Sequence, residues 1–191
     1  MTDLKLAAQR ALNLMDLTTL PRVGFRGAHS AEYLQARGFS VPQLPNRALL
    51  QADGSQVVRL SQTEYLLLGS LADRGERIAA EEAGWQLSEL GNYLLPRQDS
   101  HAWLQLSGQH LAEVMAKVCG VDLRPQAFPF GHVAQTSAAR LNVIVINAGS
   151  VELPLLHILC DRASLEYFRT AMLDAMAEFG GQPVALEALL A

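Results

Sequence analysis

The chain has 191 residues, half of them hydrophobic and 18% charged, and its formal net charge is −4. This length suffices for one domain or for two small halves that share a core. The negative charge argues against a nucleic-acid-binding protein, which needs a basic surface. No segment approaches the ~20 apolar residues of a membrane span, which argues against a membrane protein.

The two cysteines, Cys119 and Cys160, lie outside any CxxC pair, so their spacing supports neither a zinc site nor a thioredoxin-type site. Two free thiols fit a reducing compartment. The N-terminal segment MTDLKLAAQRALNLMD carries no apolar run of the kind found in export signals. We therefore expect a cytoplasmic protein.

The first half of the chain alternates strand and helix patterns. Apolar residues at helical spacing predict an amphipathic helix over residues 3–15, within an N-terminal helical arm of residues 1–19. The patterns then predict, in chain order, a strand (20–27), a helix (30–37), a proline-punctuated connector (40–47), a hairpin (47–60), a strand (63–69) and a helix (76–87). The hairpin turns at Asp53-Gly54, a dipeptide that tolerates the positive φ angles of a tight turn.

The second half repeats this order. The patterns predict a strand (101–108), a helix (108–120), a proline connector (122–131), two paired strands (132–138 and 140–147), a third strand (152–160) and a long helix (162–181). Glycines stop both helices, Gly120 the first and Gly180-Gly181 the second. The tail, residues 182–191, is expected to be a short docking segment.

One short phrase marks the same corner in both halves. Aligning Gly27 of FRGAHSAE with Gly108 of LSGQHLAE pairs His29 with His110, and in each copy a glutamate follows the histidine by three residues. Glycine permits a sharp exit from a strand, and a glutamate in the first turns of a helix is favoured by the helix dipole. The repetition therefore indicates architecture rather than two copies of a catalytic histidine.

The repeated order of elements predicts the fold class. Each half has the order β-α-β-β-β-α, so we expect an α+β protein built from two related halves. The halves span about residues 20–92 and 93–181, and together they form a single domain over residues 20–181.

No catalytic or cofactor motif is present: the chain has no GxGxxG, P-loop, HExxH or GxSxG sequence. His101 and His110 could approach each other across a strand–helix corner, but we expect structural hydrogen-bonding roles for both. His157 lies in an apolar strand, where one interpretation is a buried base with a lowered pKa. Alternation along the strand favours the other interpretation, a solvent-facing residue between Leu156 and Ile158. We predict no catalytic, cofactor-binding or metal-binding residue in this chain.

Three glutamates are further acid–base candidates. Glu81 and Glu82 fall on the predicted helix 76–87, where solvated charge is usual. Glu64 stands just before a buried strand, where a carboxylate accepts hydrogen bonds from the backbone N–H groups of the preceding turn. We therefore expect a capping role for Glu64 and surface positions for the other two glutamates.

The most unusual surface segment is the loop RPQAFPFG, which runs from Arg124 to Gly131. Its prolines exclude a helix or a central strand and hold the rings of Phe128 and Phe130 in fixed positions. Aromatic residues and arginine dominate binding hot spots, so Arg124, Phe128 and Phe130 are a possible subunit interface. The alternative is that both rings fill the core of the second half.

Four motifs, LSQTEYLLLG, LQLSGQHLAEVM, DLRPQAFPFG and AARLNVIVIN, occur in the order found in the gamma subunit of heterotetrameric sarcosine oxidase, which this chain resembles over roughly residues 20–180. The best match is the segment 122–131, which has every fixed position of the family pattern Asp-x-x-Pro-x-x-Phe-Pro-x-Gly. In the first motif Ser61-Gln62 replaces the Gly-Pro that is typical of the family.

The resemblance implies a fold similar to the folate-binding domain of glycine-cleavage aminomethyltransferases. The family enzyme oxidatively demethylates sarcosine to glycine, with tetrahydrofolate as the one-carbon acceptor. The resemblance further implies alpha, beta and delta subunits as partners that hold FAD, FMN, NAD, tetrahydrofolate and zinc. The gamma subunit then carries no cofactor and acts as a scaffold.

Two alternatives stay open. One is a stand-alone folate-binding or aminomethyltransferase-like protein, and the other is a subunit of an oxidase that acts on another N-methylated amine.

Overall fold

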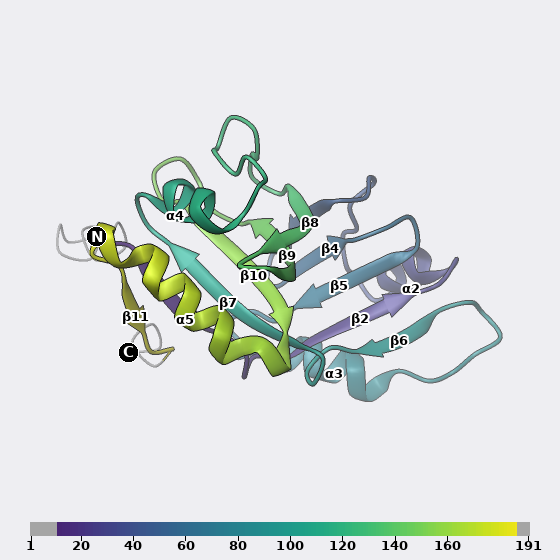
Figure 1. Cartoon of the computed structure of the whole chain (residues 1–191). Coiled ribbons are helices and arrows are strands. Elements are labelled where there is room, and N and C mark those ends of the chain that lie inside the picture. The colour runs from purple at the N-terminus through teal and green to yellow at the C-terminus, as the bar shows by residue number, and fades with distance from the viewer. Residues whose placement is uncertain (1–10, 187–191) are drawn as a thin grey trace. The chain divides into compact units, whose positions relative to one another are not determined.

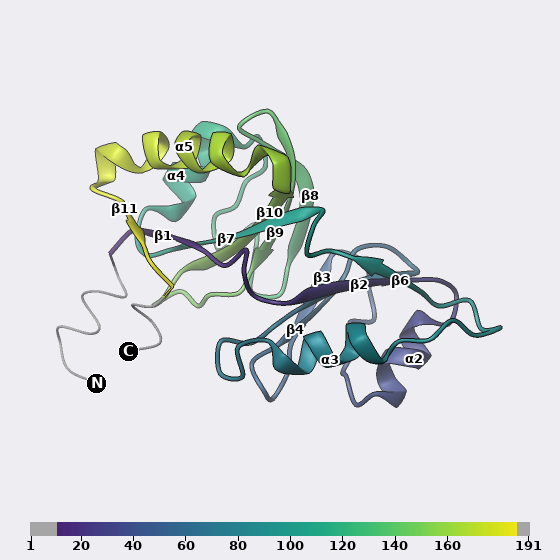
Figure 2. The same cartoon turned by 90° about the horizontal axis from the view of Figure 1, so that it is seen from below.

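The computed structural model describes residues 11–186. These residues divide into two compact units, one formed by residues 18–100 and the other by residues 101–186 together with residues 11–17. Each unit is a mainly antiparallel sheet with its two principal helices on one face, as Figure 2 shows for α2 and α3 and for α4 and α5. None of the helices in the described part of the chain is long and apolar enough to span a membrane.

The 18–100 unit holds a five-stranded antiparallel sheet in the order β3-β4-β5-β2-β6 (Figure 1). In chain order its elements are β2 (Arg22–Arg26), α2 (Ser30–Ala36), β3 (Arg47–Leu50), β4 (Gln56–Arg59), β5 (Glu64–Leu68), α3 (Glu76–Gly84) and β6 (Tyr93–Pro96). Its core joins alternate residues of the central strands, such as Val23, Phe25 and Leu67, to Leu34 of α2 and Ile78 of α3. Alternation of this kind gives a sheet one face that packs under helices.

The other unit holds a six-stranded sheet in the order β11-β1-β7-β10-β9-β8. In chain order its elements are β1 (Asn13–Asp16), β7 (His101–Ser107), α4 (Leu111–Val118), β8 (Val133–Ala138), β9 (Leu141–Asn147), β10 (Leu155–Asp161), the short 3₁₀ turn η1 (Arg162–Ser164), α5 (Leu165–Met176), the 3₁₀ turn η2 (Ala177–Phe179) and β11 (Gln182–Val184). All pairs are antiparallel except β1 with β11. Leu104, Val114 and Phe168 are fully buried in its core, between the sheet and the two helices.

The two units have the same topology, which confirms the predicted repeat. Both read β-α-β-β-β-α along the chain, and the sheet order β8-β9-β10-β7-β1 in one unit corresponds to β3-β4-β5-β2-β6 in the other. The fifth strand of each sheet was not predicted from the sequence. Strand β1 precedes β2 along the chain but pairs with β7, and β6 precedes β7 but pairs with β2.

The N-terminal helix prediction is wrong where the structure can be compared with it. Residues 13–16 form strand β1 between β7 and β11, whereas residues 3–10 of the predicted helix lie outside the described residues. Leu12, Leu14 and Met15 are all buried. Apolar residues at positions 12 and 15 fit a helical stripe, but the segment forms a strand because it hydrogen-bonds to β7 on one side and to β11 on the other.

The repeated Gly-containing corner has the same backbone hydrogen bond in both units. The Gly27 N–H donates to the carbonyl of Thr63 at 3.0 Å, and the Gly108 N–H donates to the carbonyl of Pro154 at 2.9 Å. Thr63 and Pro154 each stand immediately before the strand that follows the hairpin, β5 and β10 respectively. The phrase therefore builds one corner of the fold twice.

Both corner glycines also have a backbone that other residues avoid. Their φ angles are +149° for Gly27 and +109° for Gly108. A Cβ at Gly27 would overlap the carbonyl of Gly91, just before β6, and a Cβ at Gly108 would overlap the carbonyl of Ala11, just before β1. Only glycine lets the start of the fifth strand approach the corner this closely.

Candidate functional site

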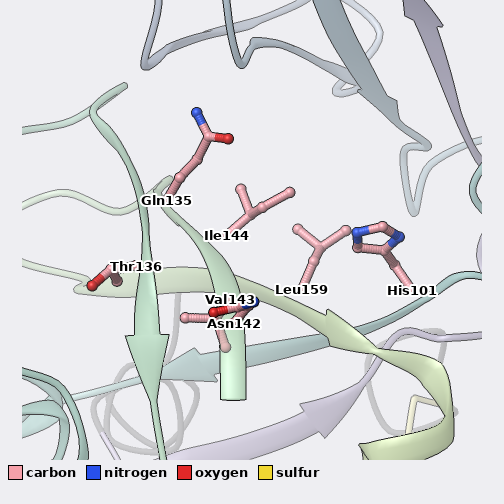
Figure 3. A pocket seen from close by; sticks show the side chains of 7 residues that line it. All are labelled: His101, Gln135, Thr136, Asn142, Val143, Ile144 and Leu159. Carbon is pink, nitrogen blue, oxygen red and sulfur yellow. The ribbon is translucent and has the colours of Figure 1, made fainter. Parts of the chain in front are cut away.

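A hollow of about 320 Å³ lies on the sheet of the 101–186 unit, where side chains of β7, β8, β9 and β10 meet (Figure 3). Gln135, Ile144 and Leu159 occupy one row across three neighbouring strands, because Ile144 is in register with both of the others. His101 and Asn142 add an imidazole and an amide to the lining. This set can hydrogen-bond a polar group but supplies no carboxylate or thiol from the lining residues.

His157 is buried in β10 with 7% of its surface exposed, so the prediction of a solvent-facing residue is wrong. The indole N–H of Trp103 donates to Nδ1 of His157 at 3.1 Å, and the two rings meet edge to face at 5.2 Å between centroids. Burial lowers the pKa of His157 to about 4, because it penalises the charged imidazolium. A proton on Nδ1 would also abolish the acceptor that Trp103 uses. His157 is therefore a neutral partner of Trp103 rather than a proton-transfer group in contact with solvent.

We expect His157 to make stability fall in mild acid. Its pKa is about 4 when folded and ~6.5 when unfolded, so below pH ~6.5 the unfolded chain binds the additional proton. The free energy of unfolding should then decrease by about 1.4 kcal/mol per pH unit as the pH falls from ~6.5 towards the folded pKa, and be insensitive to this residue at higher pH. Urea denaturation at several pH values measures this slope.

The matched control for His157 is His157→Gln, whose amide oxygen still accepts from Trp103 but does not titrate. The difference in unfolding free energy between wild type and this variant removes the contribution of the carboxylates. A difference that stays constant between pH 7 and pH 5 would contradict a buried neutral imidazole.

Two of the three glutamate candidates, Glu64 and Glu81, have ion-pair partners far along the chain. The Glu64 carboxylate accepts a hydrogen bond from Arg97 Nη2 at 2.6 Å and lies 3.9 Å from Arg26 Nη1, so the predicted capping role is wrong. Glu81 of α3 is buried and pairs with Arg37 at the end of α2, which also contradicts its predicted surface position. Glu82 is half-buried. Glu64 and Glu81 therefore fasten elements of the 18–100 unit together.

The structure separates the three predicted interface residues. Phe128 is 5% exposed and lies in the core of the 101–186 unit, where its ring meets His132 edge to face at 6.1 Å. The Asn147 side-chain amide donates to the Phe128 carbonyl at 2.6 Å and fixes the loop against the end of β9. Phe130 is 56% exposed. Phe128 therefore belongs to the core, as the alternative interpretation had it, and the interface prediction now depends on Phe130 and Arg124.

Arg124 is exposed and makes a two-pronged ion pair with Asp122, with Nη2 at 2.6 Å from Oδ2 and Nε at 2.9 Å from Oδ1. The side-chain hydrogen bond from Arg124 is the main cause that lowers the pKa of Asp122 to about 2. The same hydrogen bond raises the pKa of Arg124. The ion pair is net neutral, so Arg124 meets any partner as half of a pair and not as a lone cation.

Two hollows flank this loop. One, of about 690 Å³, runs between Ala112 and Ala116 of α4 and the segment that includes Val121 and Arg124. The other, of about 200 Å³, is lined mainly by apolar side chains, among them Phe130 and Val151, which is 75% exposed. The loop is therefore bordered on two sides by concave, largely apolar surface.

The titratable groups form no metal-binding cluster within residues 11–186, where no group of three or more His, Cys, Asp or Glu side chains could hold an ion. His101 and His110 lie at opposite ends of β7 and are not a pair. The exposed ring of His110 instead stacks on Phe179 at 5.0 Å. Cys119 and Cys160 are buried free thiols, and burial raises the pKa of Cys160 to about 11.

No protein-family model matches the chain. Among curated proteins, it is similar to gamma subunits of sarcosine oxidase. The identity is 28% over 179 residues with the subunit of Corynebacterium sp. strain P-1, covering 91% of this chain and 84% of that protein. It is 27% over 190 residues with the subunit of strain U-96, covering 95% and 87%, and 27% over 179 residues with the Arthrobacter sp. subunit, covering 92% and 85%.

Solved structures give the same result. A chain of heterotetrameric sarcosine oxidase from Corynebacterium sp. U-96, in complex with pyrrole 2-carboxylate, is 25% identical with a TM-score of 0.71, covering 93% of this chain and 89% of that one. Glycine cleavage system aminomethyltransferase T from Bartonella henselae has a TM-score of 0.66 at 14% identity, covering 95% of this chain and 50% of that one, and shows the fold alone. The predicted resemblance and the predicted fold class are confirmed.

Proposed function

We propose that this chain is the gamma subunit of a heterotetrameric complex of the sarcosine oxidase type and that it acts there as a non-catalytic scaffold. The observation that carries the proposal is similarity to gamma subunits over 91–95% of this chain and 84–87% of theirs. A relative of known structure at TM-score 0.71 is itself a chain of a heterotetramer.

The side-chain chemistry of the described residues supports a structural role. Among the acid–base candidates, Glu64 and Glu81 are ion-paired and His157 is buried against an aromatic ring. Exposed apolar side chains are available for contact with other subunits, and Phe130 and Val151 are examples. Interfaces of permanent complexes are apolar and resemble a domain core cut in half.

In the proposed complex the alpha, beta and delta subunits are the partners of this chain, and the assembly works in the cytoplasm. It oxidatively demethylates sarcosine to glycine and passes the one-carbon unit to tetrahydrofolate. FAD, FMN, NAD, tetrahydrofolate and zinc are held by the partner subunits, and this chain holds none of them.

Co-expression of the four subunits, with and without this chain, tests the proposal. We expect this chain to co-purify with the flavin-containing partners as one species in size-exclusion chromatography. Omitting it should reduce both the yield of assembled complex and sarcosine turnover, while the flavin absorbance per partner subunit stays the same. Partners that assemble and turn over fully without it, with this chain eluting as a free monomer, would contradict the proposal.

The likeness to aminomethyltransferase T is the observation behind the second candidate, a stand-alone folate-binding protein. That likeness is one of fold, and a fold does not determine a ligand. Calorimetric titration of the isolated chain with tetrahydrofolate separates the two candidates. We expect no heat of binding, and micromolar affinity would favour the folate-binding protein. Replacing sarcosine by other N-methylated amines in the turnover assay decides the substrate of the complex.

A further inference from the structure

Strand β6 is one of the two edge strands of the sheet in the 18–100 unit, and β3 is the other (Figure 1). On its inner side it pairs with β2 through Tyr93, Leu94, Leu95 and Pro96. Within the described residues no strand pairs with its outer side. An open edge offers a row of backbone N–H and C=O groups to another chain.

The other unit shows how such an edge is completed. Strand β1, the counterpart of β6, is covered by β11, which runs parallel to it with Asn13, Leu14 and Met15 in register with Gln182, Pro183 and Val184. The two edges can be aligned from the corner glycines Gly27 and Gly108. Arg26, the residue before Gly27, pairs with Tyr93 of β6, and Ser107, the residue before Gly108, pairs with Asn13 of β1. Residues 93–95 therefore correspond to 13–15, and the position of β11 has no occupant in the 18–100 unit among the described residues.

The backbone groups that face outward follow from the same correspondence. The Gln182 N–H donates to the Leu12 carbonyl at 3.0 Å, whereas the Leu17 N–H donates to Trp103 of β7. Backbone groups alternate sides along a strand, so even-numbered residues of β1 face β11 and odd-numbered residues face β7. In the 18–100 unit the outward-facing counterparts are Asn92, Leu94 and Pro96.

Leu94 and Asn92 have outward-facing backbone groups that can hydrogen-bond an added strand, whereas Pro96 is typical of an edge strand. Leu94 presents both its N–H and its carbonyl outward, and Asn92 presents its carbonyl, since its own N–H is bonded to Leu90. Pro96 has no N–H, and proline within sheets is confined to edges of this kind. The edge therefore matches a short added strand of about three residues, the length of β11.

Exposed apolar side chains accompany the open edge. Leu87 and Leu90, in the segment before β6, and Tyr93, its first residue, are 70%, 60% and 54% exposed. Leu94 is half-buried, whereas its counterpart Leu14, beneath the edge that β11 completes, is 3% exposed. Removing such apolar side chains from water favours association.

We propose that the outer edge of β6 accepts an extended, mainly apolar segment of a partner subunit, which adds as a sixth strand parallel to β6 in the place that β11 holds on β1. Main-chain hydrogen bonds to Leu94 and Asn92 give the added strand its register, and Leu87, Leu90 and Tyr93 contact its side chains. The inference rests on the proposed function, because the occupant is a subunit of that complex.

Hydrogen exchange measured by mass spectrometry on the free chain and on the assembled complex tests the inference. The peptide that contains Leu94 should exchange rapidly in the free chain and become protected in the complex. A peptide from the centre of β5, whose two edges are both paired within the unit, serves as the internal control and should not change. Unchanged exchange at Leu94 in a fully assembled complex overturns this inference and leaves the proposed function intact.

Two variants add a measurement of affinity. Leu94→Pro removes the outward N–H, and Tyr93→Glu places a charge against the added strand, so each should weaken binding to the partner subunits by at least about tenfold. The matched control is Leu44→Glu, because Leu44 is 63% exposed in the same unit but is not part of β6 or the segment before it. Circular dichroism checks folding, and Tyr93→Glu, at an exposed position, keeps the test valid if the proline variant fails to fold.

The outcomes separate the two proposals. If the wild-type chain does not join the partner subunits at all, the proposed function is overturned and this inference with it. If Tyr93→Glu and Leu44→Glu bind the partners equally well, the inference alone is overturned. A homodimer of the free chain that Tyr93→Glu dissociates would assign the edge to a second copy and overturn the assignment to a partner subunit.

Discussion

Replacing Gly108 with alanine is expected to lower the free energy of unfolding by about 3 kcal/mol or more, the combined cost of overpacking and of a left-handed backbone. The added methyl group would overlap the carbonyl of Ala11 and lie 2.9 Å from the Cα of Leu12. These are backbone atoms of the segment leading into β1, so no side chain can rotate away. The φ of +109° adds strain at any residue with a Cβ.

The control for this variant is Gly120→Ala. Gly120 follows helix α4 and has nothing within 4 Å of a Cβ built on it, so the substitution should change the unfolding free energy by no more than about 0.5 kcal/mol. Urea denaturation followed by far-ultraviolet circular dichroism measures both variants. Equal stability of the two would mean that the start of β1 can move away from the corner.

Gly27→Ala extends the same test to the 18–100 unit. Its methyl group would overlap the carbonyl of Gly91 and lie 3.0 Å from the amide nitrogen of Asn92. We expect a loss comparable to that of Gly108→Ala, because the two corners carry equivalent hydrogen bonds and equivalent close approaches. A large loss at one corner and none at the other would show that the repeat is one of topology and not of packing.

Serine at position 128 and serine at position 130 are expected to have opposite effects. Phe128→Ser should lower the free energy of unfolding by about 3–5 kcal/mol, because it removes a ring that is 5% exposed and leaves a cavity in the core. Phe130→Ser alters a ring that is 56% exposed and should stay within about 0.5 kcal/mol of wild type. Denaturant titration of the isolated chain measures both.

The assembled complex gives the second half of this comparison. If Phe130 anchors a partner, Phe130→Ser should weaken assembly by about tenfold or more while the isolated chain keeps its stability. Tyr167→Ser is the matched control in the same unit, since Tyr167 of α5 is 54% exposed. Equal retention of Phe130→Ser and Tyr167→Ser in the complex would remove the loop from the list of interfaces. Unfolding of Phe130→Ser by itself would place this ring in the core beside Phe128.

The sequence by itself determined the elements whose signals are local. The Asp53-Gly54 turn gave the hairpin, helical periodicity gave α4 and α5, and the doubled glycine–histidine phrase gave the repeat of β-α-β-β-β-α halves. Each of these signals operates over a few residues or one helical face, where backbone sterics and amphipathicity act without regard to the remainder of the chain. The resemblance to gamma subunits was visible for the same reason, in four short motifs.

The tertiary structure alone decided which groups meet across long separations. Apolar residues at 12 and 15 suit a helix as well as a strand, and only the two partners of β1 fix a strand there. Alternation along β10 predicted a solvent-facing His157, but His157 is buried, because a sheet can be covered on both of its faces. The partner of Glu64 is Arg97, on the segment after β6, and two rings two residues apart, Phe128 and Phe130, differ in burial because the loop turns between them. Pairing and burial depend on residues far away along the chain, and no local pattern specifies them.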